Sequence, residues 1–523
     1  MSLKNKLAQW LTSLSLATSI SLPSVSPSNA APASDIQGNL AEEKGKKMRY
    51  AIITSTNTYT GNWMHPVDAL KTKYPQAQVF TFRTDMQEAL PALRSYQPTH
   101  VAYVARPEEL VIPELSHNPF TDIKTAAAAG AGKFTTLLCR LDDDSFPDAI
   151  GGIITGATAD DALKLAAAKP FTISHALAKT LNEDENLVAF PNATMFSDGR
   201  PENGKVVKRE KRGKNIKKTL LDVAGPEFLE ILNTQLIDAV IVSCHASYRD
   251  WQMGWGYTDD RWIIGKNAAI YALAPDNTVS GTLNSTSSKF YLGAGNCESA
   301  RIVQGKGGFE SMALSWIHSG GVVQHLGYTL DTWHGFVGWN FRHAFLASDH
   351  PTVAEAYTQT LIATEHERQR LEAHRKKNTL PFITQNMQRF AENHELGKVY
   401  DFSGTTFYGD PWLDVRVGAE NITPLFEKSL SIQKKESTTL YTCRLKSIRE
   451  NTQINAPVVY RLPLSTKLLH VSSASPGLEY TLIDDCVIFE TNEIYTNSEL
   501  NIANHKPKTL PRDLEWKLEL RLR

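Results

Sequence analysis

AVIVSCH (residues 239–245) and FYLGAGNC (residues 290–297) decide the fold predicted for this chain. Each begins with a short apolar run of the kind that forms a strand buried on both faces. Each then passes through small or polar residues to a side chain that can react. The carboxyl ends of strands in an open parallel sheet meet at one edge, where catalytic sites collect. If the two strands are neighbours, the imidazole of His245 and the thiol of Cys297 can meet.

Similar apolar runs recur along the first 425 residues, and helical segments lie between several of them. The runs are 48–56, 78–82, 100–105, 237–243, 289–293 and 321–326. This alternation predicts an α/β region with a mostly parallel sheet flanked by helices. Beyond residue 429 the pattern changes to short alternating stretches at 438–445, 458–462, 467–472, 486–490 and 516–522. These predict a small β-sandwich.

The predicted organisation starts with an export signal over residues 1–30. Lys4 and Lys6 precede a mostly apolar stretch, and Ser28-Asn29-Ala30 offers a small-residue cleavage site. A linker follows at 31–47, then the two halves of the α/β region at 48–180 and 181–428, and a β-sandwich at 429–523. We therefore expect a protein that is secreted, periplasmic or attached to the cell surface. No later run is apolar enough to span a membrane.

The composition is that of an ordinary globular protein. The chain has 523 residues, of which 41 % are hydrophobic, and its 55 basic and 56 acidic side chains give a net charge of -1. This balance argues against nucleic acid as the main partner. Five cysteines do not make a disulfide scaffold. Cys139 and Cys244 are expected as buried thiols, whereas Cys443 and Cys486 are candidates for a disulfide.

Two charged segments are predicted to face solvent. Residues 198–218 are strongly basic and contain three glycines, which indicates an exposed loop. Three interpretations of it stay open: a solvated insertion, a site for a basic-specific processing peptidase within 205–218, or nucleic-acid binding. Residues 353–395 have a charged helical pattern and predict a solvent-facing helix pair broken near Pro381.

The strongest chemical signal is the histidine and cysteine pair. A nearby imidazole can take the proton of a thiol and so create the nucleophilic thiolate. The backbone N–H groups of Ala246 and Cys297 are candidate donors to the oxyanion that attack on a carbonyl creates. Taken singly, a cysteine after a strand is more often a buried apolar residue, and a histidine there a satisfied polar group. Their shared context and their separation of 52 positions favour the pair, because a caspase has its histidine about 50 residues before its cysteine.

These features resemble the caspase-like cysteine peptidases, and among them the gingipain type. The order is apolar strand, histidine, spacer, apolar strand and Gly295-Asn296-Cys297. Further similar segments are Gly308-Phe309-Glu310, expected to open a helix, Gly320-Gly321-Val322-Val323, the segment 408–413 (YGDPWL) and the acidic segment 142–148 (DDDSFPD) before Gly151-Gly152. The resemblance covers roughly residues 48–425. It implies a caspase-like fold followed by an immunoglobulin-like domain.

The resemblance also implies roles for single residues. His245 matches the general base and Cys297 the nucleophile. Asp148 matches an acid that orients the histidine, and Asp161 lies near an acidic specificity residue, although an acid at a helix start also stabilises the helix dipole. Two departures are Ala246, where the family has glycine, and Ile153, where it has arginine.

Other candidates near the site are less specific. Trp333 and His334 follow the cysteine and suggest a substrate wall or plain packing. His318 lies on an apolar helical segment and is expected to be structural. No metal, phosphate or dinucleotide motif occurs, so no cofactor is expected, while structural calcium is left open by the sequence.

The sequence therefore predicts an exported cysteine endopeptidase that acts on proteins or peptides through a Cys-His dyad and a thioester. Two alternatives stay open. One is a non-catalytic secreted binding or assembly protein of the same fold, and the other is a transpeptidase that passes the acyl group to an amine.

Overall fold

A computed structural model describes residues 48–522, apart from 117, 180–189, 198, 200–201, 254–261, 275, 306–307, 333–334, 381–393, 422–423, 436–437, 449–451, 464–465 and 498–501. The predicted export signal and linker therefore lie outside the described residues. Within the described part, no helix combines the length and apolar character needed to cross a membrane.

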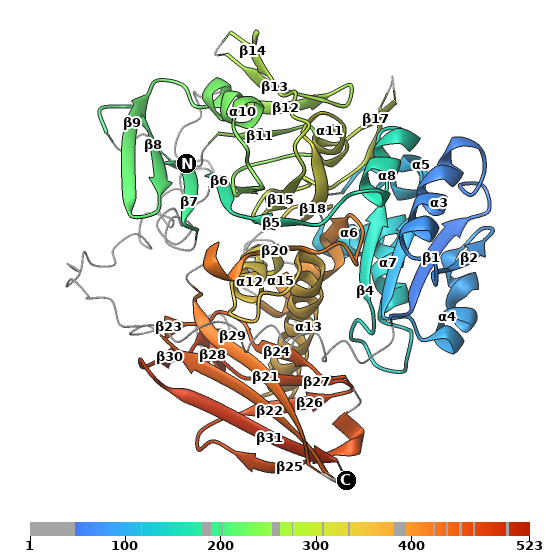
Figure 1. The fold of residues 1–523 in the computed structure, drawn as a ribbon, viewed down its shortest axis with the longest axis vertical. Coiled ribbons are helices and arrows are strands. Elements are labelled where there is room, and N and C mark those ends of the chain that lie inside the picture. Colours follow the sequence, from blue (N-terminus) through green and yellow to red (C-terminus); the bar gives the residue numbers. More distant parts are fainter. Residues whose placement is uncertain are drawn as a thin grey trace. The chain divides into compact units, whose positions relative to one another are not determined.

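The described residues are organised around a twelve-stranded mixed sheet (Figure 1). Parallel strands form two groups, and the antiparallel pair of β18 and β19 joins them. In spatial order the strands are β2 (Gln78–Phe82), β1 (Tyr50–Ser55), β3 (His100–Val104), β4 (Ile150–Ile154), β19 (Thr405–Tyr408), β18 (Val322–Tyr328), β15 (Lys289–Gly293), β10 (Ala239–Val242), β6 (His175–Lys179), β7 (Asn192–Phe196), β8 (Val206–Arg212) and β9 (Asn215–Leu221). The α/β class with a mostly parallel sheet is confirmed.

Helices cover both faces of the sheet, which explains why its central strands β10, β15 and β18 are buried at every position. In β15, Phe290 and Leu292 pack into one buried cluster with α12 (Phe336–Phe345) and α13 (Val353–Lys377). Tyr291, between them, packs on the other face with α10 (Gly225–Thr234) and α11 (Met312–Ser319). Because successive side chains of a strand point to opposite faces, both faces need apolar residues here.

The first group of strands has its own helices. Apolar side chains of β1, β3 and β4 pack with α3 (Met64–Lys73), α4 (Leu90–Tyr96), α7 (Gly130–Leu138) and α8 (Ala159–Ala166) in one buried cluster. The segment 308–310, expected to open a helix, instead forms strand β17 (Gly308–Glu310), and α11 begins after it because Ser311 caps the helix.

The C-terminal strands, orange to red in Figure 1, form antiparallel sheets. One has the order β21 (Phe426–Lys435), β22 (Thr438–Ser447), β31 (Glu515–Leu522) and β25 (Leu469–Ala474). Another has the order β24 (Val458–Arg461), β27 (Cys486–Phe489) and β26 (Tyr480–Ile483). Both sheets contribute side chains to one buried cluster, Cys443 and Leu518 from the first, and Tyr460 and Phe489 from the second. This shared core is the arrangement expected of a sandwich.

The basic segment is not the loop that its composition predicts. Residues 206–221 form the hairpin of β8 and β9 at the edge of the large sheet. Its lysines and arginines stand in adjacent pairs along both strands, and Lys208 pairs with Glu210 and Glu227. Lysines on an edge strand discourage pairing with other chains. A processing cut within 205–218 would have to act on this hairpin, and it stays a prediction.

The prediction of a solvent-facing helix over the charged residues after 353 is also wrong. α13 is buried over most of its length, because it contacts β4 as well as β24 and β29 (Ile502–Pro507) of the C-terminal strands. Charged side chains of α13 form ion pairs inside the protein, as Glu367 does with Lys398. The predicted break near Pro381 lies outside the described residues.

All five cysteines are free thiols. Cys139 and Cys244 are buried, as expected. Cys443 and Cys486, the candidates for a disulfide, belong to two different buried clusters and are not paired.

Candidate active site

β10 and β15 are adjacent parallel strands, which brings the two reactive turns to the same edge of the sheet. Their register pairs Ala239 with Phe290 and Val242 with Gly293. His245 follows β10 by three residues, and Cys297 follows β15 by four. The turns that carry the imidazole and the thiol therefore leave the sheet next to each other.

Asn296 links these two turns. Its Oδ1 accepts the backbone N–H of Cys244 at 3.0 Å, and the Cys244 thiol lies 3.7 Å from the same oxygen. Its Nδ2 lies 3.5 Å from the hydroxyl of Tyr291, at the outer limit of a hydrogen bond. Asn296 and Cys244 are fully buried and directly precede Cys297 and His245. The sequence shows Asn296 only as part of a motif, and nothing in it indicates this contact.

The turn after β10 continues into a hairpin. The carbonyl oxygen of His245 accepts the backbone N–H of Gln252 at 2.8 Å, and Ala246 forms an antiparallel bridge with Trp251. Trp251 is fully buried, so it anchors the hairpin, while the side chain of His245 is exposed. An exposed imidazole at a fixed backbone position is accessible to a substrate.

The thiol of Cys297 is partly buried, and both backbone polar groups of Thr332 contact its sulfur. Its Sγ lies 3.3 Å from the backbone nitrogen of Thr332 and 3.5 Å from the carbonyl oxygen of the same residue. Burial, followed by the charge of Asp331, raises the pKa of the Cys297 thiol to about 12, against the opposing N–H of Thr332. At neutral pH this thiol is protonated. Attack on a carbonyl therefore requires a base that removes the proton.

The backbone just after Cys297 is held in a strained turn. Glu298 has a φ of 53°, in the left-handed region that residues with a side chain rarely adopt. Its N–H donates to the carbonyl oxygen of Leu330 at 3.0 Å, and Arg301 pairs with its carboxylate. Strain of this kind persists where neighbouring contacts over-determine a conformation, and it is frequent at functional sites.

Two glycines allow helix α12 to approach the turn of Cys297. A Cβ on Gly338 would lie 2.2 Å from the carbonyl oxygen of Ala294, and one on Gly335 would lie 2.7 Å from it. Gly335 also has a φ of 60°. The start of α12 therefore packs directly on the segment that precedes the nucleophile.

Asp148 is placed in a different set of contacts. Its Oδ2 accepts the backbone N–H of Asp142 at 3.1 Å, and its carbonyl oxygen accepts from Arg461 of β24. Burial, together with the charges of Asp142 and Asp144, raises the pKa of Asp148 to about 8. These contacts give no support to a role in orienting His245. Oxygens of Asp142, Asp144 and Asp148 lie within 4.8 Å of one another and could share a metal ion.

Asp161 lies at the opposite edge of the sheet from Cys297. Its carboxylate caps α8 through Thr158, pairs with Lys164 at 3.0 Å and lies 2.9 Å from Nδ1 of His318. Burial opposes ionisation, but the hydrogen bonds from His318 and Lys164 outweigh it and lower the pKa of Asp161.

His318 precedes β18, whereas Thr332, which brackets the thiol, follows it. The seven residues of β18 separate the two positions by roughly 20 Å. We therefore do not assign Asp161 to substrate specificity, and the prediction for His318, a structural role, agrees with this contact. Trp333 and His334, the predicted substrate wall, lie outside the described residues.

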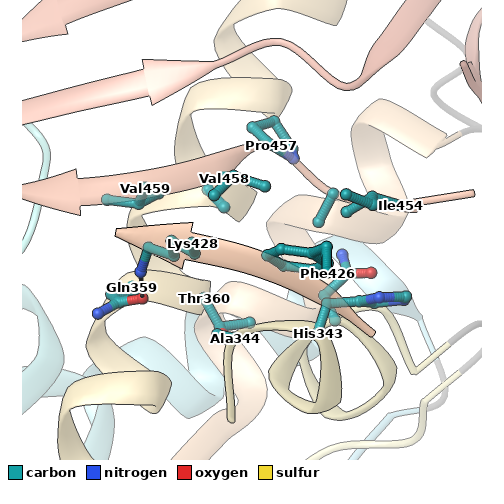
Figure 2. A pocket seen from close by; sticks show the side chains of 13 residues that line it. His343, Ala344, Gln359, Thr360, Phe426, Lys428, Ile454, Pro457, Val458 and Val459 are labelled. Carbon is teal, nitrogen blue, oxygen red and sulfur yellow. Dashed lines mark hydrogen bonds between the residues drawn. The ribbon is translucent and has the colours of Figure 1, made fainter. Parts of the chain in front are cut away.

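A small cavity in the described part lies elsewhere, between α12, α13 and the C-terminal strands (Figure 2). Apolar side chains such as Phe426, Val458 and Ile454 line it, and Lys428 donates to Gln359 at its rim at 2.9 Å. Burial, and then Arg342, lowers the pKa of His343 beside it to about 3, so this histidine is neutral. The lining includes neither His245 nor Cys297 and does not belong to the thiol site.

Comparisons with family models, curated proteins and solved structures gave matches only among the solved structures. No family model matches the chain, and no curated protein matches it. It is similar in structure to the Arg specific cysteine proteinase gingipain R, with a TM-score of 0.38 and 12 % identity over 89 % of this chain and 98 % of that one. It is also similar to the complex of Porphyromonas gingivalis RgpB pro- and mature domains, with a TM-score of 0.37 and 11 % identity over 88 % and 99 %.

Proposed function

We propose that this chain is an exported cysteine endopeptidase in which His245 and Cys297 form the catalytic dyad. The observation that carries the proposal is the pairing of β10 with β15, together with the Asn296 link between the two turns. This pairing supports the proposal because the turns that carry the exposed imidazole and the thiol leave adjacent strands at one edge of the sheet. Because the pKa of the resting thiol is about 12, a base is needed to remove its proton.

The proposed reaction is acyl transfer to water. His245 removes the proton of Cys297, and the thiolate forms a bond to the carbonyl carbon of the substrate. The backbone N–H groups of Ala246 and Cys297 donate to the oxyanion. The imidazolium then protonates the leaving amine as the C–N bond breaks, which leaves a thioester. Water, deprotonated by His245, attacks the thioester and releases the carboxylic acid and the thiol.

A non-catalytic role is the second candidate, because the charged groups that shift the pKa of Cys297 are all acidic. Asp331, Glu298 and Asp401 each raise it. A protein that only binds partners has no need to ionise this thiol.

The two candidates are separated with purified mature protein and a mixed library of quenched peptides. A catalytic dyad predicts selective alkylation of Cys297 and losses on the order of 10³-fold or more in kcat/KM for Cys297→Ala and for His245→Ala. Cys139→Ala, which removes another buried thiol, and His318→Ala, at the opposite sheet edge, are the matched controls and should retain hydrolysis.

Hydrolysis by Cys297→Ala at the rate of the parent would refute the proposal. No hydrolysis by the parent, with an unreactive Cys297, would establish the non-catalytic alternative. Products joined to an added amine would identify a transpeptidase.

A further inference from the structure

The loop that brackets the thiol is attached to a buried carboxylate on another helix. The backbone nitrogen and carbonyl oxygen of Thr332 both contact Cys297 Sγ. Its side-chain Oγ1 lies 3.5 Å from Oδ1 of Asp401. The same Oγ1 accepts the backbone N–H of Gly335 at 2.7 Å. Asp401 lies on α15 (His394–Gly404) and is 2 % exposed.

Asp401 also holds the start of α12. Its Oδ2 accepts the backbone N–H of Val337 at 3.4 Å, and the N–H of Phe336 donates to the same carboxylate. A carboxylate is favoured at this position because the first N–H groups of a helix have no partner within it. One side chain thus joins Thr332, which precedes α12, to the first turn of that helix.

The position of Asp401 is itself fixed by buried contacts of α15. Lys398, one turn earlier, lies 4.3 Å from the ring centre of Phe336 and pairs with Glu367 of α13 at 2.9 Å. At the other side, the carbonyl oxygen of Asp401 accepts from Thr405 of β19. The carboxylate therefore has a rigid base from which to hold the loop.

We infer that Asp401 is a positioning residue for the nucleophile. Through the hydroxyl of Thr332 it holds in place the backbone N–H and carbonyl of Thr332, which orient the Cys297 thiol. This rests on the proposed function of Cys297. Asp401 does not touch the sulfur in the contacts described, and it exchanges no proton in the reaction. Its charge also raises the pKa of the thiol. Its positioning effect passes through Thr332 and through the first turn of α12.

The test compares Asp401→Asn, Thr332→Val and Thr332→Ser with the parent chain. Asp401→Asn and Thr332→Val should lower kcat at least tenfold while KM stays within threefold, because orientation of the sulfur and not substrate binding is lost. Thr332→Ser retains the hydroxyl and should restore kcat to within threefold of the parent.

Asp238→Asn is the matched control, because Asp238 also accepts one hydroxyl and two backbone N–H groups, those of Ser174 and His175, but at the start of β10. It should leave kcat within twofold. Parental kcat in Thr332→Val, or equal loss in Thr332→Val and Thr332→Ser, would overturn the inference. The comparison of Thr332→Val with Thr332→Ser tests the inference even if Asp401→Asn fails to fold.

If the parent hydrolyses no peptide, the proposed function fails. The inference is then tested by the reactivity of the Cys297 thiol toward an alkylating reagent. The rate of alkylation of Cys297 by iodoacetamide, followed by mass spectrometry, should then differ at least fivefold between the parent and Thr332→Val, with Thr332→Ser matching the parent. Equal rates in all three would overturn the inference independently of peptide hydrolysis.

Discussion

At the scale of single residues, Asn296 connects the two reactive turns through a hydrogen bond. It is fully buried, and it accepts the N–H that directly precedes His245. A change here leaves a buried N–H without its acceptor, which typically costs about 1–3 kcal/mol. It also frees one turn to move relative to the other.

We predict that Asn296→Ala lowers the free energy of unfolding by about 1–3 kcal/mol. Because small misplacement of reacting groups is costly, kcat should fall on the order of 10²-fold. Urea unfolding and peptide hydrolysis measure the two effects. Asn233→Ala, which removes an exposed asparagine that bonds the backbone of Thr282 and Asn284, is the control and should retain kcat. A parental kcat in Asn296→Ala would show that the link does not position the turns.

Asp148 predicts a pH dependence of stability. Its pKa is raised to about 8 in the folded protein, against about 3.9 in an unfolded chain. The folded state thus holds the proton more tightly, so its contribution is fully present below pH ~4 and is lost as the pH rises toward 8.

We therefore expect Asp148→Asn, which mimics the protonated form, to be more stable than the parent at pH 8 and to show a smaller difference at pH 4. Urea unfolding at both values measures this. Asp143→Asn, at an exposed carboxylate of the same segment, should show no such change between the two pH values. An Asp148→Asn variant that gains nothing at pH 8 would contradict the raised pKa.

At the scale of elements, the close approach of α12 to the turn after β15 decides the position of Cys297. We predict that Gly338→Ala forces the helix away from Ala294, whose carbonyl oxygen would lie 2.2 Å from the new Cβ. Overpacking of this kind costs about 1–3 kcal/mol, and kcat should fall with it. Gly281→Ala, where the nearest atom would lie at 3.6 Å, is the matched control. Equal stability and kcat in the two variants would refute the tight contact.

At the scale of the whole molecule, a buried ionic network joins α13, α15 and the C-terminal strands. Glu367 of α13 pairs with Lys398 of α15, and its other oxygen lies 3.0 Å from His505 and accepts from Asn492. Glu367 and Lys398 are fully buried. Removing one member of such a pair leaves an uncompensated charge, which is strongly destabilising.

We predict that Glu367→Gln lowers the free energy of unfolding by about 3–5 kcal/mol, and that Lys398→Met in the same chain recovers much of it. Calorimetry or urea unfolding of both variants measures the difference. Glu372→Gln, which breaks the partly exposed pairs with Lys376 and Arg368 on the same helix, should cost about 1 kcal/mol or less. A double variant no more stable than Glu367→Gln would show that the penalty does not come from the unpaired lysine.

The sequence by itself determined the fold class and several of the buried strands. The runs at 78–82 and 289–293 became β2 and β15 with the same bounds, because a short stretch rich in aromatic or β-branched residues has few alternatives to a strand. The pattern also indicated that His245 and Cys297 follow two of these strands. It was wrong where burial depends on distant partners, as in the basic hairpin of β8 and β9 and in α13, whose charges are neutralised by the C-terminal strands.

Only the tertiary structure decided which side chains surround the thiol. The Asn296 contact joins residues 52 positions apart, and the path from Thr332 to Asp401 spans 69. Local patterns carry no information on such pairs, because a polar residue beside a strand or within a helix is equally compatible with solvent. The partners were selected when the sheet, α12 and α15 packed together, since each buried polar group then had to find a hydrogen bond. The same packing placed Asp161 at the far edge of the sheet, which no spacing in the sequence could reveal.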